Sequence, residues 1–142
     1  MIVRLYEQHD EDQLVFDTSQ DYMRDFLSEA ALDLEPLVKQ DLVWTGEHNG
    51  KVVAMGGVVP VWHNRAQAWM WMSEVSGRHM ITIHREVKKF LDACPVPRIE
   101  AHVNVGFKPG VRWMQMLGFE MEGYMRKFGP SGADMLLFAR VK

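Results

Sequence analysis

The sequence predicts an α+β domain in which a mixed, mostly antiparallel sheet is flanked by helices. Apolar residues recur at helical spacing over residues 11–34, whereas from residue 41 they form short runs bounded by turn residues. A helical face then returns at residues 80–91, before further strands. The predicted order is β-αα-βββ-α-β-α-ββ. With 142 residues, 47% of them hydrophobic, the chain is long enough for one sizeable core, and we expect a single domain over residues 1–142.

The N-terminal third is predicted to hold one strand and one or two helices. Ile2, Val3 and Leu5 indicate the strand. Asp10, followed three residues later by Gln13, has the spacing of a capping box at a helix start. The helical pattern continues to Leu34, and Pro36 ends it.

A group of three strands is predicted to follow. Asn49-Gly50 favours a hairpin turn because both residues tolerate positive φ. Gly56-Gly57 interrupts the second apolar run, which indicates a bulge or a close backbone approach. Pro60 places this run at a sheet edge or near its end. The runs are residues 42–45, residues 51–55 with 58–59, and residues 66–72.

The C-terminal half opens at the junction "EVSGRHMI", residues 74–81, where an apolar strand passes into an amphipathic helix. Residues 99–105 then alternate as a strand with one polar face, and Gly118 is the expected C-cap of a short helix over residues 109–117. Residues 120–128 and 133–141 are expected to form a final hairpin.

Composition excludes several classes of protein. No apolar stretch approaches the roughly 20 residues of a membrane span, and the chain is not basic enough to indicate nucleic-acid binding. The first residues lack the basic start and apolar block of a signal peptide, and a single cysteine, Cys94, fits a reducing cytoplasm. Acidic side chains dominate residues 1–50 and basic ones residues 51–142. This asymmetry fits either an anionic ligand on the second half or two solvated faces.

The segment "RIEAHVNVGFKPGVRWMQMLGFEMEGYMRK", residues 98–127, resembles the C-terminal signature of the GNAT superfamily of acetyl-CoA-dependent N-acetyltransferases. That signature is a strand, a short helix ending in Leu-Gly-Phe, and a strand that starts with charged residues. The resemblance implies a GNAT-like fold, acetyl-CoA as the acyl donor and an amine as the acceptor.

Residues 53–142 also resemble a phage-encoded branch of this fold, the small internal virion protein of short-tailed phages. The features shared are the Gly-Gly strand, the Ser-Gly junction and the Gly-rich final hairpin. This second resemblance implies a protein without catalysis, acting as a virion component or a host-factor binder. It also implies a location in the bacterial host cytoplasm and in the virion.

The GNAT resemblance places coenzyme A along the central strand and at the start of the helix that follows. There, backbone N–H groups hold the pyrophosphate. Two positions that are small in the family are His79 and Ile81 here, so the site is either reduced or lost; Arg78 and His79 can supply side-chain donors instead. The residues implied in cofactor binding are Met72, Ser73, Val75, Ser76, Gly77, Arg78, His79, Met80 and Asn104.

The resemblance assigns Glu74, at the end of the central strand, to deprotonation of the acceptor amine. A carboxylate that stabilises the helix N-terminus is the alternative. The family's usual acid, a tyrosine, is replaced by Met114. We expect no metal site, since His79 and His84 are one residue too far apart for the i, i+4 pair. Trp69 and Trp71 project to one face, which either packs in the core or binds a partner protein.

Overall fold

In the computed structural model, residues 1–7, 9–10, 42–73, 76–129 and 131–142 are described. The strands are β1 (Ile2–Leu5), β2 (Val43–His48), β3 (Lys51–Trp62), β4 (Arg65–Met72), β5 (Arg98–Asn104), β6 (Glu120–Met125) and β7 (Met135–Val141). The helices are the 3-10 helix η2 (Ser76–His79), α4 (Met80–Ala93) and α5 (Lys108–Met116). The helices predicted within residues 11–34 lie outside the described residues.

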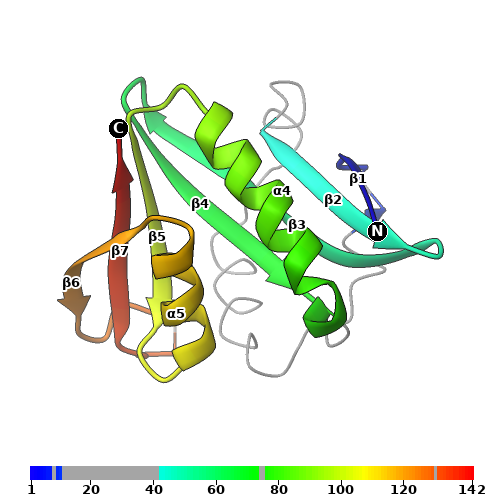
Figure 1. The fold of residues 1–142 in the computed structure, drawn as a ribbon. Coiled ribbons are helices and arrows are strands. Elements are labelled where there is room, and N and C mark those ends of the chain that lie inside the picture. Colours follow the sequence, from blue (N-terminus) through cyan, green and yellow to red (C-terminus); the bar gives the residue numbers. More distant parts are fainter. Residues whose placement is uncertain (8, 11–41, 74–75, 130) are drawn as a thin grey trace.

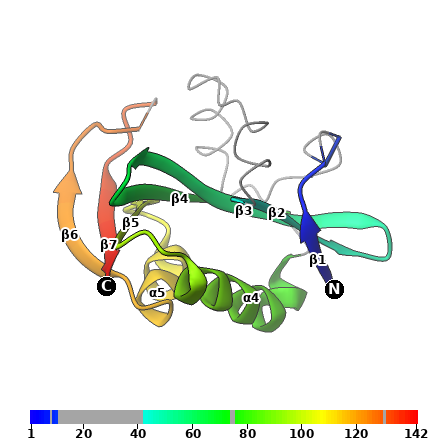
Figure 2. The same cartoon turned by 90° about the horizontal axis from the view of Figure 1, so that it is seen from above.

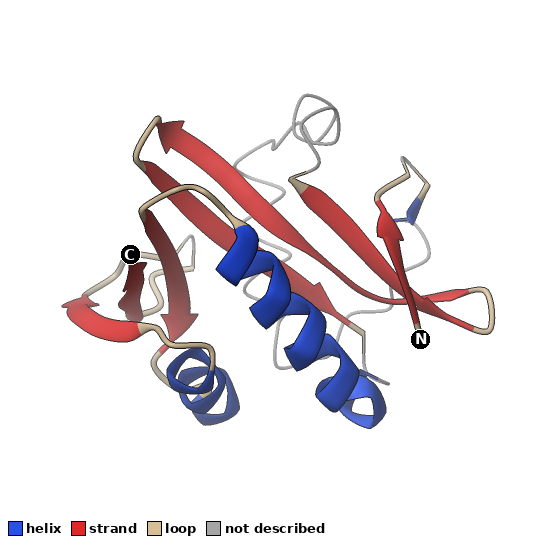
Figure 3. Ribbon diagram, turned by 45° about the horizontal axis from the view of Figure 1, so that its top comes forward, coloured by secondary structure: helices blue, strands red, loops and turns tan. Residues whose placement is uncertain are grey.

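The strands form one seven-stranded sheet in the order β1-β2-β3-β4-β5-β7-β6. Every described pair is antiparallel except β4–β5, which is parallel. The predicted mixed, mostly antiparallel sheet is therefore confirmed. Figure 3 shows the sheet crossed by the two α-helices.

Turn chemistry explains the β2–β3 hairpin and the course of β3. Asn49 and Gly50 both have positive φ, 52° and 74°, as the Asn-Gly step predicts. The predicted interruption at Gly56-Gly57 is wrong, because β3 runs through both residues without a bulge there. The close backbone approach is confirmed: a Cβ added at Gly57 would lie 2.1 Å from the Leu42 carbonyl oxygen. β2 pairs with β3 only as far as Gly57. Within the described residues, Pro60 therefore has β4 as a neighbouring strand on one side and no strand on the other.

Helices α4 and α5 cover the same face of the sheet (Figure 2). Ile83 of α4 is fully buried and packs with Trp44 and Val53. Under α5, the core includes Leu117, Phe119 and Phe138 together with the buried thiol of Cys94. Gly118, with φ of 87°, ends α5 as predicted.

Trp69 and Trp71 lie on the opposite face of β4, as their spacing predicts. Their ring centroids are 5.3 Å apart, and both residues are buried in a cluster with Tyr6 and Val43. Core packing therefore accounts for these two indoles. Among the described helices, none is long and apolar enough to cross a bilayer.

Candidate functional site

The sheet opens between its two parallel strands. β4 and β5 pair at only three register positions, Arg65↔Arg98, Ala66↔Ile99 and Gln67↔Glu100, and then diverge. Beyond that point β4 follows β3 and β5 follows β7 (Figure 1). Along residues 68–70, the β5-facing edge of β4 has no neighbouring strand in the described part of the chain. Such an edge offers backbone donors and acceptors to a ligand.

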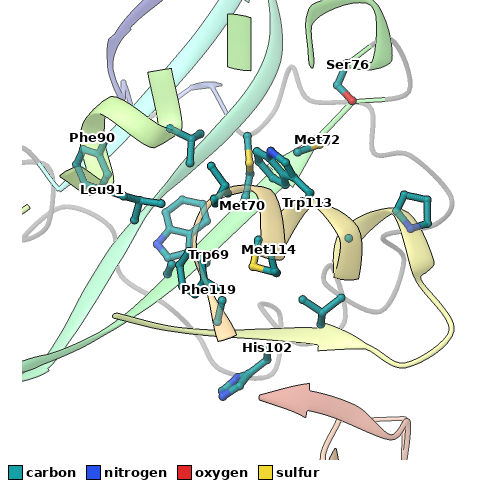
Figure 4. A pocket seen from close by; sticks show the side chains of 18 of the residues that line it. Trp69, Met70, Met72, Ser76, Phe90, Leu91, His102, Trp113, Met114 and Phe119 are labelled. Carbon is teal, nitrogen blue, oxygen red and sulfur yellow. The ribbon is translucent and has the colours of Figure 1, made fainter. Parts of the chain in front are cut away.

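A cavity of about 560 Å³ occupies this opening, beneath α4 and α5 (Figure 4). Its walls are almost entirely apolar. The strands and the start of α4 contribute Trp44, Gly57, Val58, Ala68, Trp69, Met70, Met72, Ser76, Gly77, Met80, Ala101, His102 and Val103. The rest of α4, α5 and the adjoining segments contribute Val87, Phe90, Leu91, Phe107, Pro109, Gly110, Trp113, Met114, Leu117 and Phe119.

The cavity is bordered by residues whose side chains project to both faces of the sheet. Side chains alternate between the two faces of a strand, so Trp69 and Met70 project to opposite faces, as do His102 and Val103. All four line the cavity. In Figure 4, His102 projects from β5 away from Met114 and Phe119. The residues of the two faces thus meet at this cavity, and the His102 ring lies on the far face.

The start of α4 forms one end of the cavity. Ser76, Gly77 and Met80 line it, and the N-cap residue His79 makes no side-chain capping hydrogen bond. The N–H groups of a first helical turn have no partner within the helix, and with the helix dipole they favour an anion. A Cβ added at Gly77 would meet no heavy atom within 4 Å. The fold itself thus leaves room at this glycine, as an approaching ligand requires.

The two bulky residues of the junction stay out of the cavity. The His79 ring contacts that of His48 in the β2–β3 hairpin, with centroids 4.7 Å apart and the planes tilted by 47°, and Ile81 is 79% exposed. Neither residue lines the cavity wall. The bulk at these positions therefore does not fill the space where the phosphate groups were expected.

The surroundings of His79 are cationic. Burial lowers the pKa of His79 below its ordinary value, and His48, the N-terminal amine and Arg78 lower it further. These influences favour the neutral form of His79. A bound phosphate would act in the opposite direction and favour its charged form.

The other residues predicted to bind the cofactor do not all face the cavity. Met72 lines the cavity, but the Ser73 N–H donates to the Val53 carbonyl oxygen at 2.9 Å and so faces β3. Arg78 is exposed, and the Asn104 carboxamide oxygen accepts the Gly106 N–H at 2.9 Å, which ties it to its own loop. Glu74 and Val75 lie outside the described residues.

The α5 wall carries no acid. Met114 lines the cavity at the position where the resemblance implied a tyrosine, and the Trp113 indole N–H donates to His84 Nδ1 at 3.1 Å. Of the described lining residues, His102 has the one titratable side chain.

His102 was not among the predicted site residues. Its Nδ1 lies 3.0 Å from the Gln67 side-chain nitrogen, and its ring meets the edge of Phe128 with centroids 4.8 Å apart. Burial lowers its pKa below the ordinary 6.5. The alternation of Glu100, His102 and Asn104 on the polar face of β5 was visible in the sequence. What was not visible is that this face borders the opening.

Comparison with solved structures identifies the fold. Ribosomal-protein-alanine N-acetyltransferase from Brucella melitensis superposes with a TM-score of 0.67 at 15% identity, covering 100% of both chains. A GNAT-family acetyltransferase from Bacillus anthracis gives 0.66 at 18%, covering 98% of this chain and 93% of its own. The yncA protein from Salmonella typhimurium, solved with its cofactor acetyl-CoA, gives 0.66 at 15%, covering 99% and 92%.

No protein-family model and no curated protein sequence matches the chain. At these identities, likeness in structure establishes the fold alone. The chain thus has the fold of the GNAT N-acetyltransferases, which confirms the fold expected from the Leu-Gly-Phe signature.

Proposed function

We propose that this protein is an N-acetyltransferase that binds acetyl-CoA in the opening between β4 and β5. The observation that carries the proposal is the early separation of these strands into an apolar cavity that ends at the N-terminus of α4. This arrangement suits a ligand with a thin, amide-containing arm and a phosphate-rich end. One structural neighbour, yncA, was solved with acetyl-CoA.

The chain's own groups supply the contacts. The edge of β4 at residues 68–70, which has no neighbouring strand in the described part of the chain, would pair with the amides of the pantetheine arm, and Met70 and Met72 would pack along it. The pyrophosphate would lie against the N–H groups at the start of α4, next to Gly77. His79 and Arg78 stand close enough in sequence to add side-chain donors there.

The reaction forms a C–N bond and breaks a C–S bond. The amine nitrogen attacks the thioester carbonyl carbon, loses a proton to a base, and the coenzyme A thiolate leaves. Met114 cannot protonate that thiolate. A thiol with a pKa near 8.5 leaves as the anion, so transfer proceeds without an acid, although more slowly.

The alternative is a GNAT-fold protein without catalysis, a phage virion component or host-factor binder. Met114 in place of the tyrosine favours it, because that substitution removes the family's acid. The open cavity and the clear helix start favour a bound acyl donor. A measurement of acetyl-CoA binding distinguishes the two proposals.

Calorimetric titration with acetyl-CoA is the test, with Gly77→Asp as the disabling variant. We expect micromolar affinity, about −8 kcal/mol, and at least a tenfold loss in the variant, because a carboxylate would stand where the pyrophosphate binds. Gly123→Asp is the matched control: its added Cβ also meets nothing within 4 Å, and it lies in β6.

Absence of binding at millimolar acetyl-CoA would refute the cofactor assignment and leave the non-catalytic alternative. If binding is found, transfer is measured by thiol release with a peptide bearing an N-terminal alanine and with spermidine. Structural neighbours are named as transferases for these acceptors.

A further inference from the structure

We propose that His102 is the general base that removes the proton from the acceptor amine, and that Gln67 holds its ring in position. This inference rests on the proposed acetyl transfer. It assigns the role to a side chain in β5 instead of Glu74 at the end of β4.

The position of the two residues in the sheet carries the inference. Gln67 is the last residue of β4 that pairs with β5, and its partner is Glu100. His102 follows two residues later on the same face of β5, where the strands have begun to separate. The contact of 3.0 Å between their side chains therefore spans the first part of the opening.

The far face of the sheet is the side from which an amine can reach the thioester. The cavity space beneath α4 and α5 is where the acyl donor would lie, and His102 borders the same cavity from the opposite face. An acceptor that enters beside Phe128, whose ring contacts His102, would meet the imidazole before the carbonyl carbon. Proton transfer from the amine to His102 and attack of its nitrogen on the carbonyl carbon then both take place in the opening between β4 and β5.

Gln67 decides which imidazole nitrogen is available. A carboxamide presents a donor on one side and an acceptor on the other, and rotating it by 180° exchanges the two without moving other atoms. In the structure the Gln67 nitrogen faces Nδ1 at 3.0 Å and donates to it, which places the ring proton on Nε2. After the 180° rotation the Gln67 oxygen faces His102 instead, and the amide accepts the Nδ1–H. The lone pair on Nε2 is then free to take a proton from the amine.

Burial and the surrounding charges together favour the neutral form of His102. Burial is the largest influence and lowers its pKa; Arg65 lowers it further and Glu100 raises it. Arg65 binds the Glu100 carboxylate at 2.5 and 3.0 Å, so these two charges largely offset each other. Arg98 also contacts the Glu100 carboxylate, at 3.4 Å. Leu137, the register partner of His102 in β7, and Phe128 after β6 carry no charge. A neutral imidazole at pH 7 acts as a base and not as an acid.

The step balances without a further reactant. The ammonium form of the acceptor gives one proton to Nε2, and the freed nitrogen pair forms the new bond to the carbonyl carbon. The electron pair of the broken C–S bond leaves on sulfur. The nitrogen in the new bond still holds one proton more than an amide carries, and it gives that proton to the departing thiolate. The proton on His102 passes to water, and the neutral imidazole is restored.

The experiment compares pH profiles of kcat/KM for the wild type, His102→Gln, Gln67→Glu and the control His63→Gln, using the acceptor that gives the faster thiol release. His63 is exposed in the β3–β4 turn. We expect a wild-type acid limb with an apparent pKa below 6.5. His102→Gln should lose that limb and lower kcat about 100-fold at pH 7.5, with unchanged acetyl-CoA affinity by calorimetry. His63→Gln should match the wild type.

The Gln67→Glu variant tests whether Gln67 positions the His102 ring or contributes only to the stability of the fold. A carboxylate beside Nδ1–H favours the imidazolium, so the acid limb should move to higher pH. The Hε1 proton resonance of His102, followed by NMR, should report the same upward shift of its pKa without any turnover.

Three results would overturn the proposal. The first is His102→Gln with wild-type kcat and the acid limb intact. The second is a His102 resonance unmoved by Gln67→Glu. The third is a wild type that binds acetyl-CoA yet releases no thiol with either acceptor. If, in contrast, calorimetric titration detects no binding of acetyl-CoA, the proposed function itself is refuted.

Discussion

At the scale of single residues, two glycines near the cavity are present for different reasons. Gly57 lies where the backbone of Leu42 runs alongside β3, with the Leu42 carbonyl oxygen accepting the Val58 N–H at 3.1 Å, and an added Cβ would be 2.1 Å from that oxygen. Gly77 has open space around it and lines the cavity. The first glycine is required by the packing of two backbones, whereas the second is free to serve a ligand.

Gly57→Ala should therefore destabilise the protein by about 2–3 kcal/mol, because a backbone carbonyl cannot turn aside as a side chain does. Gly77→Ala should change the free energy of unfolding by less than about 0.5 kcal/mol. Urea denaturation of both variants measures the difference. Equal losses in the two variants would contradict the assignment of these glycines.

His79 leads to a prediction on pH. Its pKa is lowered by burial and by neighbouring cations in the free protein, and a bound pyrophosphate would raise it. Binding should then take up protons, so the affinity for acetyl-CoA should increase as the pH falls from 8 toward 6. Calorimetry in buffers of different ionisation enthalpy measures this proton uptake.

The uptake should shrink in His79→Gln and persist in His63→Gln, an exposed histidine remote from the junction in sequence. Any remaining uptake in His79→Gln reports the phosphate groups themselves. Identical uptake in the wild type and His79→Gln would show that His79 does not contact the anion.

At the scale of elements, an ion pair attaches β1 to the sheet. Arg4 of β1 donates two hydrogen bonds to Asp10, at 2.7 and 2.9 Å, and the Thr45 hydroxyl of β2 donates a third to the same carboxylate at 2.9 Å. The Glu7 N–H donates a fourth, at 2.7 Å. Asp10 is fully buried, so its charge depends on these donors.

Asp10→Asn should lower the free energy of unfolding by about 3 kcal/mol at pH 7, because it leaves Arg4 and its neighbours with an inadequate acceptor.

Burial raises the pKa of Asp10, but the hydrogen bonds of Arg4, Glu7 and Thr45 outweigh it, and the net pKa lies below the ordinary 3.8. The stabilisation is thus present above pH 3.8 and is lost as the pH falls through the lower folded value. Thermal unfolding should show the wild type and variant converging below pH 3.8; a constant gap would contradict this account.

At the scale of the whole molecule, the sequence predicted every described strand and both described α-helices, since periodicity and turn residues are local signals. Asn49-Gly50 and Gly118 are examples, and both adopt the positive φ expected of them. The cavity could not be predicted in this way, because it depends on where β4 and β5 stop pairing. For the same reason His102 was missed, and His79 and Ile81 seemed to obstruct a site that they leave open.

The partial separation of β4 from β5 divides the sheet into β1–β4 and β5–β7, joined by three paired positions and by the helices across one face. A ligand in the opening would supply the missing neighbour for the edge of β4 and contact β5 as well. Acetyl-CoA should therefore slow amide hydrogen exchange in peptides covering residues 68–72 and 101–104, while β6, at the far edge, exchanges as before. Exchange measured by mass spectrometry, with and without acetyl-CoA and with Gly77→Asp as the control, tests this. Protection confined to β6 and β7, or equal protection in the Gly77→Asp variant, would place the ligand outside the opening and remove the structural basis for His102 as the base.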